Sequence, residues 1–289
     1  MRRRAIRWKI LGLGAFFWAN SAAGAEPPPP EAPLPLWEAG AGAGSLLIPA
    51  YKGSGTMRTF TAPLPYFVYR GETLRTNRDG VGLRMLGAEN WKLDLSLSGA
   101  LPVQSSGTRR NGMQDLPLVG EIGPVLKYNF VDTASLQSQL RLPLRYATGL
   151  HTNGLQGVGW ISDPGLWVSG TIARLGPGWQ WGGSLNVNLQ SRSYDNFYYG
   201  VGAADAVPGR RQYLARGGYA GADFRVGVVR RYANLIVSGF AGVSDISGAS
   251  FRDSPLVERT TNLYAGAALI WVFQRSATAS KTGPSGDLQ

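Results

Sequence analysis

Apolar side chains recur at every second residue along much of this 289-residue chain, and this period limits the fold more than any other feature. The stretch 262–273 shows the pattern most clearly. Leu263, Leu269 and Trp271 fall on one side of it, and Tyr264 falls on the other. A period of two places alternate side chains on opposite faces of a β-strand, whereas a helix repeats about every 3.6 residues. The stretch is therefore predicted to be a strand with a large apolar face and a smaller opposite face. An edge strand of a soluble β-sandwich is the alternative.

The same alternation returns in three further segments, whose polar faces are unusual. These faces carry Gln, Asn and Ser with few charges, whereas many Lys and Glu are expected on a sheet that faces water. A polar face of this kind suits the interior of a barrel, and the apolar face suits lipid. We therefore predict an all-β fold, a single antiparallel transmembrane β-barrel. The apolar residues that carry the three patterns are Leu93, Leu95 and Leu97; Leu140, Leu142 and Leu144; and Leu185, Val187 and Leu189.

Strand counting gives a topology of about twelve strands. With the N-terminus in the periplasm, the connections on that side are short turns and the long loops fall on the outer side, as in outer-membrane barrels. Dropping the weakest strand together with a neighbour leaves about ten strands as the alternative. The long outer segments are 102–117, 147–156, 193–212 and 245–261. The predicted strands are 36–47, 60–70, 73–77, 81–87, 91–101, 118–130, 134–146, 157–173, 179–192, 213–228, 233–244 and 262–273.

The two ends of the chain are predicted to lie outside the barrel. A cationic start, an apolar run and small residues before the cleavage site mark residues 1–25 as a secretory signal peptide. The apolar run is too short to span a bilayer as a helix. The proline-rich stretch 26–35 is predicted to be a periplasmic linker, 36–273 the barrel, and 274–289 a disordered polar tail.

Composition narrows the range of partners. Five basic residues precede Ala25, so the formal charge of +11 falls to +6 in the mature chain. Export and the lack of interleaved basic and aromatic runs make nucleic acid an unexpected partner. Lys and Arg near a membrane surface are instead expected to meet outer-membrane lipid and the phosphates of lipopolysaccharide. The chain contains no Cys, so disulfides and thiolate metal sites are excluded.

Hairpin register predicts charge pairs inside the barrel. A turn centred on Asp132 places Glu121 opposite Pro143. Arg141 and Arg145 then lie on the diagonals, within reach of a long side chain. These charges either brace a narrow barrel or line a conduction path. The predicted lumen charges, including Arg84 opposite Asp94 across the preceding hairpin, are Arg84, Asp94, Glu121, Lys127, Arg141 and Arg145.

The search for catalytic chemistry finds little. The sole histidine, His151, falls in a predicted outer loop, with Ser162 further along the chain. Imidazole can take the proton of a serine hydroxyl during acyl transfer, so an outer-membrane lipid hydrolase or acylase is one alternative function. The carboxylates and the histidine do not have the spacing of a metal site, and no phosphate-binding loop leads from a strand into a helix. We therefore predict no catalytic, cofactor-binding or metal site.

Two resemblances follow from short motifs. The last predicted strand resembles the signal that directs bacterial outer-membrane barrels to insertion, through Tyr264, Gly266, Leu269, Trp271 and Phe273. The region from Trp37 to Phe273 resembles the MipA/OmpV family of outer-membrane proteins, the MltA-interacting proteins. Six segments carry this likeness in order, and the positions singled out in them are Tyr51, Gly53, Tyr66, Tyr69, Arg70, Gly71, Asp115, Glu121, Gly123, Pro124, Tyr198, Tyr199, Gly200, Gly217, Gly218, Asp253, Ser254 and Pro255.

The family resemblance implies a location in the outer membrane and a role as a scaffold. Its members are associated with assembling a murein-degrading lytic transglycosylase and a murein polymerase. This chain is therefore expected to bind such periplasmic enzymes without catalysis and without a cofactor. A small porin-like channel for polar solutes is the other alternative. The motifs in the outer loops are expected to fold inward and seal the barrel, with Tyr198 and Tyr199 packing near Pro255.

Overall fold

The computed structural model describes residues 35–70, 74–77, 80–87, 90–133, 135–151 and 154–278, and it describes no side chain between residues 71 and 89. The predicted signal peptide, nearly all of the predicted linker, and residues 279–289 of the predicted tail lie outside the described residues.

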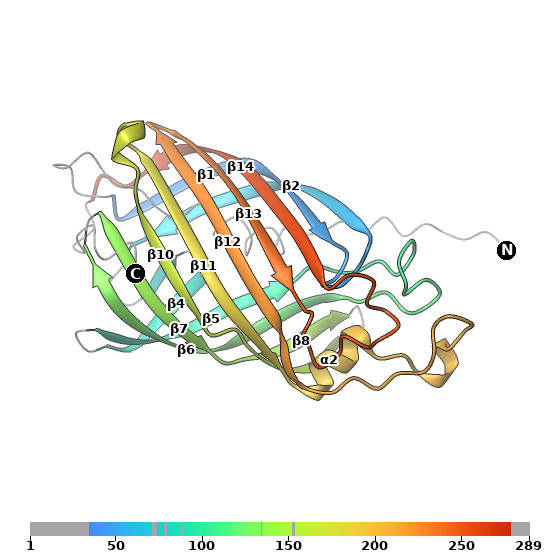
Figure 1. The fold of residues 1–289 in the computed structure, drawn as a ribbon. Coiled ribbons are helices and arrows are strands. Elements are labelled where there is room, and N and C mark those ends of the chain that lie inside the picture. Colours follow the sequence, from blue (N-terminus) through green and yellow to red (C-terminus); the bar gives the residue numbers. More distant parts are fainter. Residues whose placement is uncertain are drawn as a thin grey trace.

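Antiparallel strands wind around one axis and form a barrel (Figure 1). β7 and β8 form one pass that is interrupted at Leu144, and β9 and β10 form another that is interrupted at Asp163 and Pro164. The fourteen strands therefore make twelve passes, as predicted. The strands are β1 (Trp37–Pro49), β2 (Met57–Tyr69), β3 (Leu74–Asn77), β4 (Gly80–Gly87), β5 (Trp91–Ala100), β6 (Leu118–Asp132), β7 (Leu136–Pro143), β8 (Arg145–His151), β9 (Gly154–Ser162), β10 (Gly165–Thr171), β11 (Trp179–Gln190), β12 (Gly218–Tyr232), β13 (Leu235–Asp245) and β14 (Thr261–Arg275).

The first and last strands pair with each other. β1 lies between β2 and β14, and the hydrogen-bonded order then runs from β14 through β13, β12 and β11 toward β3. Gly42 of β1 faces Ile270 of β14, and a Cβ atom at Gly42 would run into the carbonyl oxygen of Leu269. Glycine is therefore needed at this position because the two backbones approach so closely.

Large apolar side chains cover the outside of the barrel. On β14, Leu263, Trp271 and Phe273 are 71%, 56% and 62% exposed, whereas Ile270 and Val272 on the other face are buried. This is the alternation that the sequence predicted, and it confirms a barrel with an apolar outer surface and a mostly polar lumen. The helices in the described part of the chain are too short or too polar to span a bilayer.

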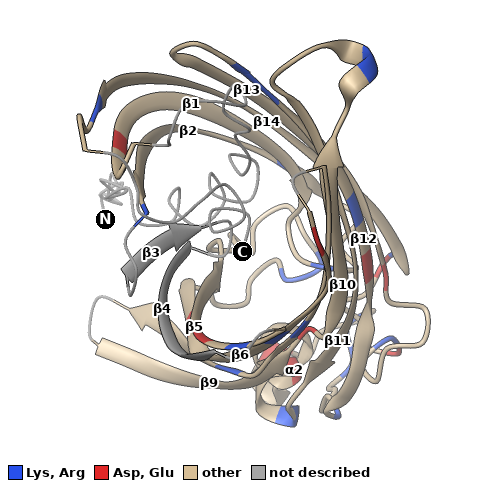
Figure 2. Cartoon of the chain, turned by 90° about the vertical axis from the view of Figure 1, so that its left-hand side faces the viewer, with Lys and Arg blue, Asp and Glu red and all other residues tan. Residues whose placement is uncertain are grey.

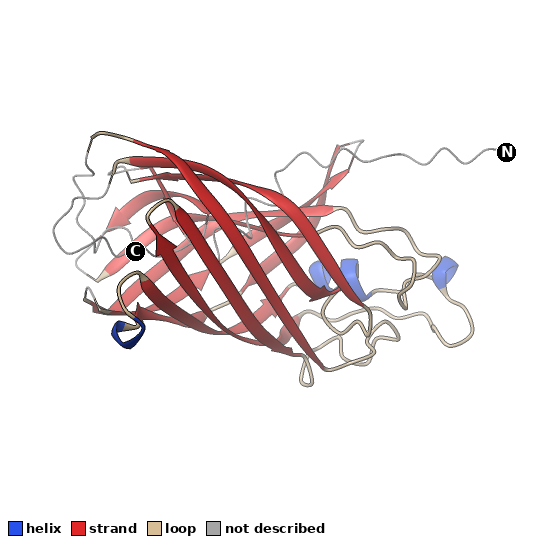
Figure 3. Ribbon diagram, turned by 90° about the horizontal axis from the view of Figure 1, so that it is seen from above, coloured by secondary structure: helices blue, strands red, loops and turns tan. Residues whose placement is uncertain are grey.

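The two ends of the barrel differ, as Figures 1 and 3 show. Short turns and a single turn of 3-10 helix, η1 (Ala173–Leu175), lie at the periplasmic end. The outer end carries the long segments 101–117, 191–217 and 246–260, which we call the outer cap. The cap contains helix α2 (Arg192–Tyr199) and the 3-10 turn η2 (Ala203–Asp205).

Three details of the predicted outer end are wrong. The predicted long loop 147–156 is instead a hairpin, since β8 continues to His151 and β9 begins at Gly154. β12 begins at Gly218 rather than at residue 213. The predicted loop 193–212 contains α2, whose N-cap Ser191 accepts a hydrogen bond from the backbone N–H of Tyr194. An amphipathic helix of only eight residues, about two turns, is too short to stand out from loop sequence.

Candidate functional site: outer cap, lumen and periplasmic rim

The outer cap is a packed cluster rather than a set of open loops. The ring of Tyr199 stacks on Phe251 with a centroid distance of 3.7 Å. The hydroxyl of Ser254 donates to the carbonyl oxygen of Tyr199 at 2.8 Å, and the hydroxyl of Tyr51 donates to that of Leu256, also at 2.8 Å. Burial raises the pKa of Tyr51 to about 12, so its phenol remains a donor. Tyr199 thus packs beside residues 254–256 as predicted, whereas the ring of Tyr198 packs against Tyr194 and Phe197.

α2 carries an ionisable group into the cap. Asp195 is fully buried, with Ser250 Oγ 3.1 Å from its Oδ2, and its Oδ1 has no hydrogen-bond partner among the described residues. Burial raises the pKa of Asp195 from 3.8 to about 7. The hydrogen bond from Ser250 offsets only part of this effect. The closed cap therefore favours the protonated carboxyl.

A charge network ties the cap to the barrel wall. Arg145 Nε lies 3.1 Å from Glu121 Oε2, and a second nitrogen of Arg145 pairs with Asp163. Tyr194 of α2 donates to the other oxygen of Glu121 at 3.2 Å. Both Arg145 and Glu121 are buried, so the pair faces the lumen rather than lipid.

The predicted register of this hairpin is wrong, although the Glu121–Arg145 contact is present. Glu121 lies opposite Ala147, and Pro143 lies opposite Val125. β6 continues to Asp132 and β7 begins at Leu136, so the strands reverse after Asp132 rather than around it, and β6 carries a bulge between Asn129 and Val131 before this point. Moving a turn by two residues shifts every cross-strand partner by four.

The other predicted lumen charges also lie on the inner wall. Lys127 is buried and contacts Asp94 at 3.0 Å. Arg141 is buried, its guanidinium lying 4.1 Å from the ring centroid of Trp167. The backbone of Arg84 pairs with that of Asp94 as predicted, and the side chain of Arg84 lies outside the described residues. Figure 2, which looks along the barrel, colours the charged positions on the wall. Below the cap the lumen holds a cavity of about 410 Å³, which Glu121, Arg141 and Arg145 help to line.

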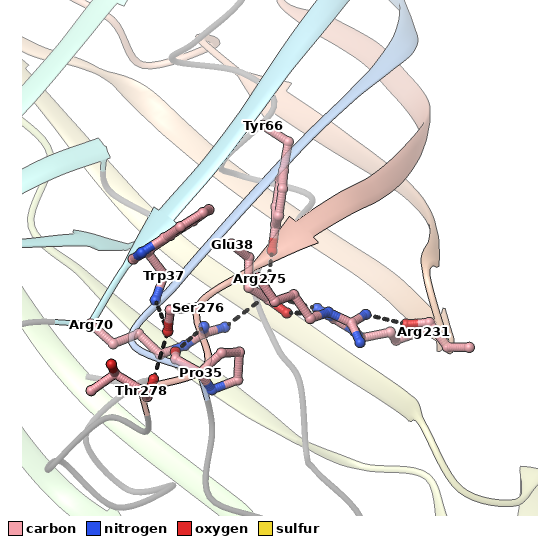
Figure 4. Close-up of polar contacts among 10 residues, drawn as sticks. Pro35, Trp37, Glu38, Tyr66, Arg70, Arg231, Arg275, Ser276 and Thr278 are labelled. Atoms are coloured by element: carbon pink, nitrogen blue, oxygen red, sulfur yellow. Dashed lines mark hydrogen bonds and ion pairs between the residues drawn. The ribbon is translucent and has the colours of Figure 1, made fainter.

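A buried carboxylate organises the periplasmic rim (Figure 4). Glu38 at the start of β1 is fully buried, and three arginines surround it. Arg70 Nη2 lies 3.1 Å from Glu38 Oε2, Arg231 pairs with both carboxylate oxygens, and Arg275 Nε lies 3.0 Å from Oε1. The hydroxyl of Tyr66 completes the group at 3.4 Å. This Glu38 cluster ties together β1, β2, β12 and β14, where the first and last strands meet.

The two ends of the described chain pair with each other beside the same cluster. Arg70 Nη1 donates to the carbonyl oxygen of Pro35 at 2.9 Å. The backbone N–H of Leu36 donates to Thr278 at 2.8 Å, and that of Ser276 donates to Trp37 at 2.9 Å. The pairing therefore continues past the predicted barrel boundary at Phe273, and the two ends of the described chain lie side by side at the rim.

The family-motif positions fall into three groups. Those at the outer end are Tyr51, Gly53, Asp115, Tyr198, Tyr199, Gly200, Gly217, Gly218, Asp253, Ser254 and Pro255. Those in the wall are Glu121, Gly123 and Pro124 of β6, and those near the periplasmic rim are Tyr66, Tyr69 and Arg70. Gly71 lies outside the described residues.

The residues of the insertion signal divide between the two faces of β14. Tyr264 lines the lumen cavity, and Gly266 makes room for Phe240, whose ring would lie 2.6 Å from a Cβ atom at that position. Leu269, Trp271 and Phe273 are exposed on the lipid side.

The structure does not bring together the residues of a hydrolase. His151 Nε2 lies 2.7 Å from Gln156 Oε1, whereas Ser162 donates to the carbonyl oxygen of Pro143. Ser162 lies eight residues beyond the residue paired with His151, or roughly 26 Å along the strand. In the described part of the chain, no group of three or more His, Asp or Glu side chains could hold a metal ion.

Sequence reasoning missed the Glu38 cluster and Asp195. Glu38 begins a strand of Gly and Ala, and a lone acidic residue at such a position was the available signal. Its partner Arg231 is 193 residues away, which no local pattern could reveal.

Comparison with known proteins places the chain in a family. Residues 41–273 match the family model described as MltA-interacting protein MipA. No curated protein matches. The chain is also similar to an outer-membrane channel from Pseudomonas putida F1 (12% identity, 86% of this chain and 100% of that chain, TM-score 0.44). It is similar to the NanC porin as well (7% identity, 81% of this chain and 100% of that chain, TM-score 0.38).

The match to the family model begins within β1 and ends within β14, so it spans the barrel and its outer cap. The chain therefore belongs to the MipA family, and it is a β-barrel protein of the outer membrane.

Proposed function

We propose that this chain is a non-catalytic scaffold that binds murein-remodelling enzymes, a lytic transglycosylase and a murein polymerase, at the periplasmic face of the outer membrane. The observation that carries the proposal is the match of residues 41–273 to the MltA-interacting proteins. MltA, the partner in that family name, is the lytic transglycosylase of this proposal.

The packing of the outer cap supports a scaffold over a porin-like channel. Tyr51, Tyr199, Phe251 and Leu256 are all buried above the lumen cavity. A polar solute would have to displace this apolar cluster and the hydrogen bonds that hold it. Charges such as Arg145 and Glu121 then serve to brace the barrel, which explains why each already has a partner.

The periplasmic rim supplies the surface for the partner. The short turns at this end offer little area, whereas a stable interface takes about 800 Å² from each protein. At the rim, Arg70 of the Glu38 cluster binds the carbonyl oxygen of Pro35, and backbone hydrogen bonds hold Leu36 and Trp37 beside the segment 276–278. We therefore assign the docking surface to the rim together with the proline-rich segment 26–35 that leads into it.

The test is retention of a purified lytic transglycosylase by the mature protein in detergent micelles. We expect the intact protein to retain the enzyme, and a variant that lacks residues 26–34 to retain at least tenfold less. An unrelated outer-membrane barrel is the control. Equal retention by the control barrel refutes the scaffold. Equal retention by the truncated variant refutes the role of the linker alone.

A further inference from the structure

A second pocket, at the outer end of the barrel, is separate from the lumen and from the periplasmic rim. Its volume is about 330 Å³, at the lower end of the range of roughly 300–1,000 Å³ for ligand pockets. Three parts of the fold wall it: the loop 101–117, the β8–β9 hairpin and the segment 191–217. His151 and Gln156, which contact each other at 2.7 Å, form the hairpin side.

Buried arginines keep the walls of this pocket in place. Arg110 Nη1 donates to the carbonyl oxygen of Tyr198 at 2.7 Å, which joins the loop 101–117 to α2. Arg210 Nη1 donates to the carbonyl oxygens of Arg109 and Asn111 at 2.9 and 2.7 Å. Hydrogen bonds of buried arginines therefore hold the loops that form the pocket walls.

Several polar atoms in the lining have capacity left for a ligand. Arg110 is only 3% exposed, and its Nε has no hydrogen-bond partner among the described residues. Asp115 uses one oxygen to accept the backbone N–H of Ser105 at 2.7 Å, and its second oxygen can accept another hydrogen bond. Asn196 uses its Oδ1 to accept the backbone N–H of Ala215 at 3.0 Å, which leaves its NH₂ group as a donor.

The mixture of groups defines the class of ligand. Side chains of Asp115, Asp205, Gln156 and Gln212 offer acceptors and donors for hydroxyl groups. Phe197 and Tyr213 add apolar ring surface. Two carboxylates against one guanidinium do not suit a phosphate, and so many polar groups do not suit a hydrocarbon chain.

We propose that this outer pocket binds a sugar residue of a neutral glycan at the cell surface. Three segments singled out in the sequence, 112–116, 198–201 and 213–218, contribute to its walls. The proposed binding of murein enzymes at the periplasmic rim does not involve these three segments, because the segments lie at the opposite end of the barrel. The inference is thus independent of the scaffold function.

The test is calorimetric titration of the full mature protein with glucose, galactose, mannose and N-acetylglucosamine. The detergent must carry no sugar headgroup. We expect saturable binding of at least one sugar and at least tenfold weaker binding in Asp115→Asn, which retains an acceptor for the N–H of Ser105. Asp253→Asn, an exposed acidic residue of the cap that does not line the pocket, is the matched control.

A second variant keeps the test valid even if Asp115→Asn does not fold. Gln212→Ala removes an exposed side chain that lines the pocket and makes no hydrogen bond among the described residues, and it is expected to weaken binding severalfold. Heat-dependent migration on gels reports whether each variant is folded. A titration with dephosphorylated lipopolysaccharide core oligosaccharide identifies the source of the glycan: tighter binding than to free sugars assigns it to lipopolysaccharide, and weaker binding assigns it to another surface glycan. The proposal is overturned if no sugar binds, if inorganic phosphate competes with the sugar, or if both pocket variants bind like the control.

Discussion

The buried carboxyl of Asp195 makes the outer cap sensitive to pH. In the closed cap its pKa is about 7, whereas in an opened cap, with water around the carboxyl, it returns to about 3.8. The protonated carboxyl of Asp195 therefore favours the closed cap over the opened cap. This contribution is fully present below pH 3.8 and is lost as the pH rises through about 7. The pKa of Asp195 differs by about three units between the closed and the opened cap, which corresponds to roughly 4 kcal/mol in the free energy of opening. Between pH 5 and pH 8 the opening constant is expected to rise roughly a hundredfold.

Cysteine labelling measures this opening, since the chain has no Cys of its own. Ala215 is fully buried in the cap, and its neighbour Leu214 is 60% exposed. The labelling rate of Ala215→Cys, divided by that of Leu214→Cys, cancels the effect of pH on the thiol itself. We expect this ratio to rise with pH. It is expected to become nearly flat when Asp195→Asn is added, because the amide does not ionise.

Two results would refute this reasoning. A ratio that does not change between pH 5 and pH 8 would mean that the buried carboxyl does not govern cap opening. A ratio that rises equally in the Asp195→Asn background would assign the pH dependence to another group in the cap.

Two further predictions concern the junction of the first and last strands. Glu38→Gln removes the counter-charge of three arginines, and it is expected to lower the free energy of unfolding in lipid vesicles by roughly 3–5 kcal/mol. Glu258→Gln, which breaks an exposed pair with Arg109, is expected to cost less than about 1 kcal/mol; equal midpoints in urea for the two variants would contradict a structural role of Glu38. Gly42→Ala places a Cβ atom against Leu269 and is expected to lower the yield of folded barrel, measured on gels, by interfering with β1–β14 pairing. Gly120→Ala, where a Cβ atom meets nothing within 4 Å, is the control. A similar yield of folded barrel for both variants would show that the close approach of β1 and β14 at Gly42 does not require glycine.

The sequence by itself determined which face of each strand meets lipid. Alternation is a local property, because neighbouring side chains on a strand always point to opposite faces. Leu263, Trp271 and Phe273 could therefore be assigned to the outside, and Glu121 and Arg145 to the lumen, without knowledge of any contact. The number of passes and the difference between short and long connections followed from the same pattern.

Only the tertiary structure decided the register and the shape of the outer end. The partner of Glu121 depends on where one turn falls, and the sequence around residues 131–135 does not fix the turn to within two residues. Glu38 and Arg231, or Tyr51 and Leu256, meet across about 200 residues of chain only after the barrel closes its first strand on its last. Each such contact joins strands or loops that are distant in sequence, so no local pattern encodes it.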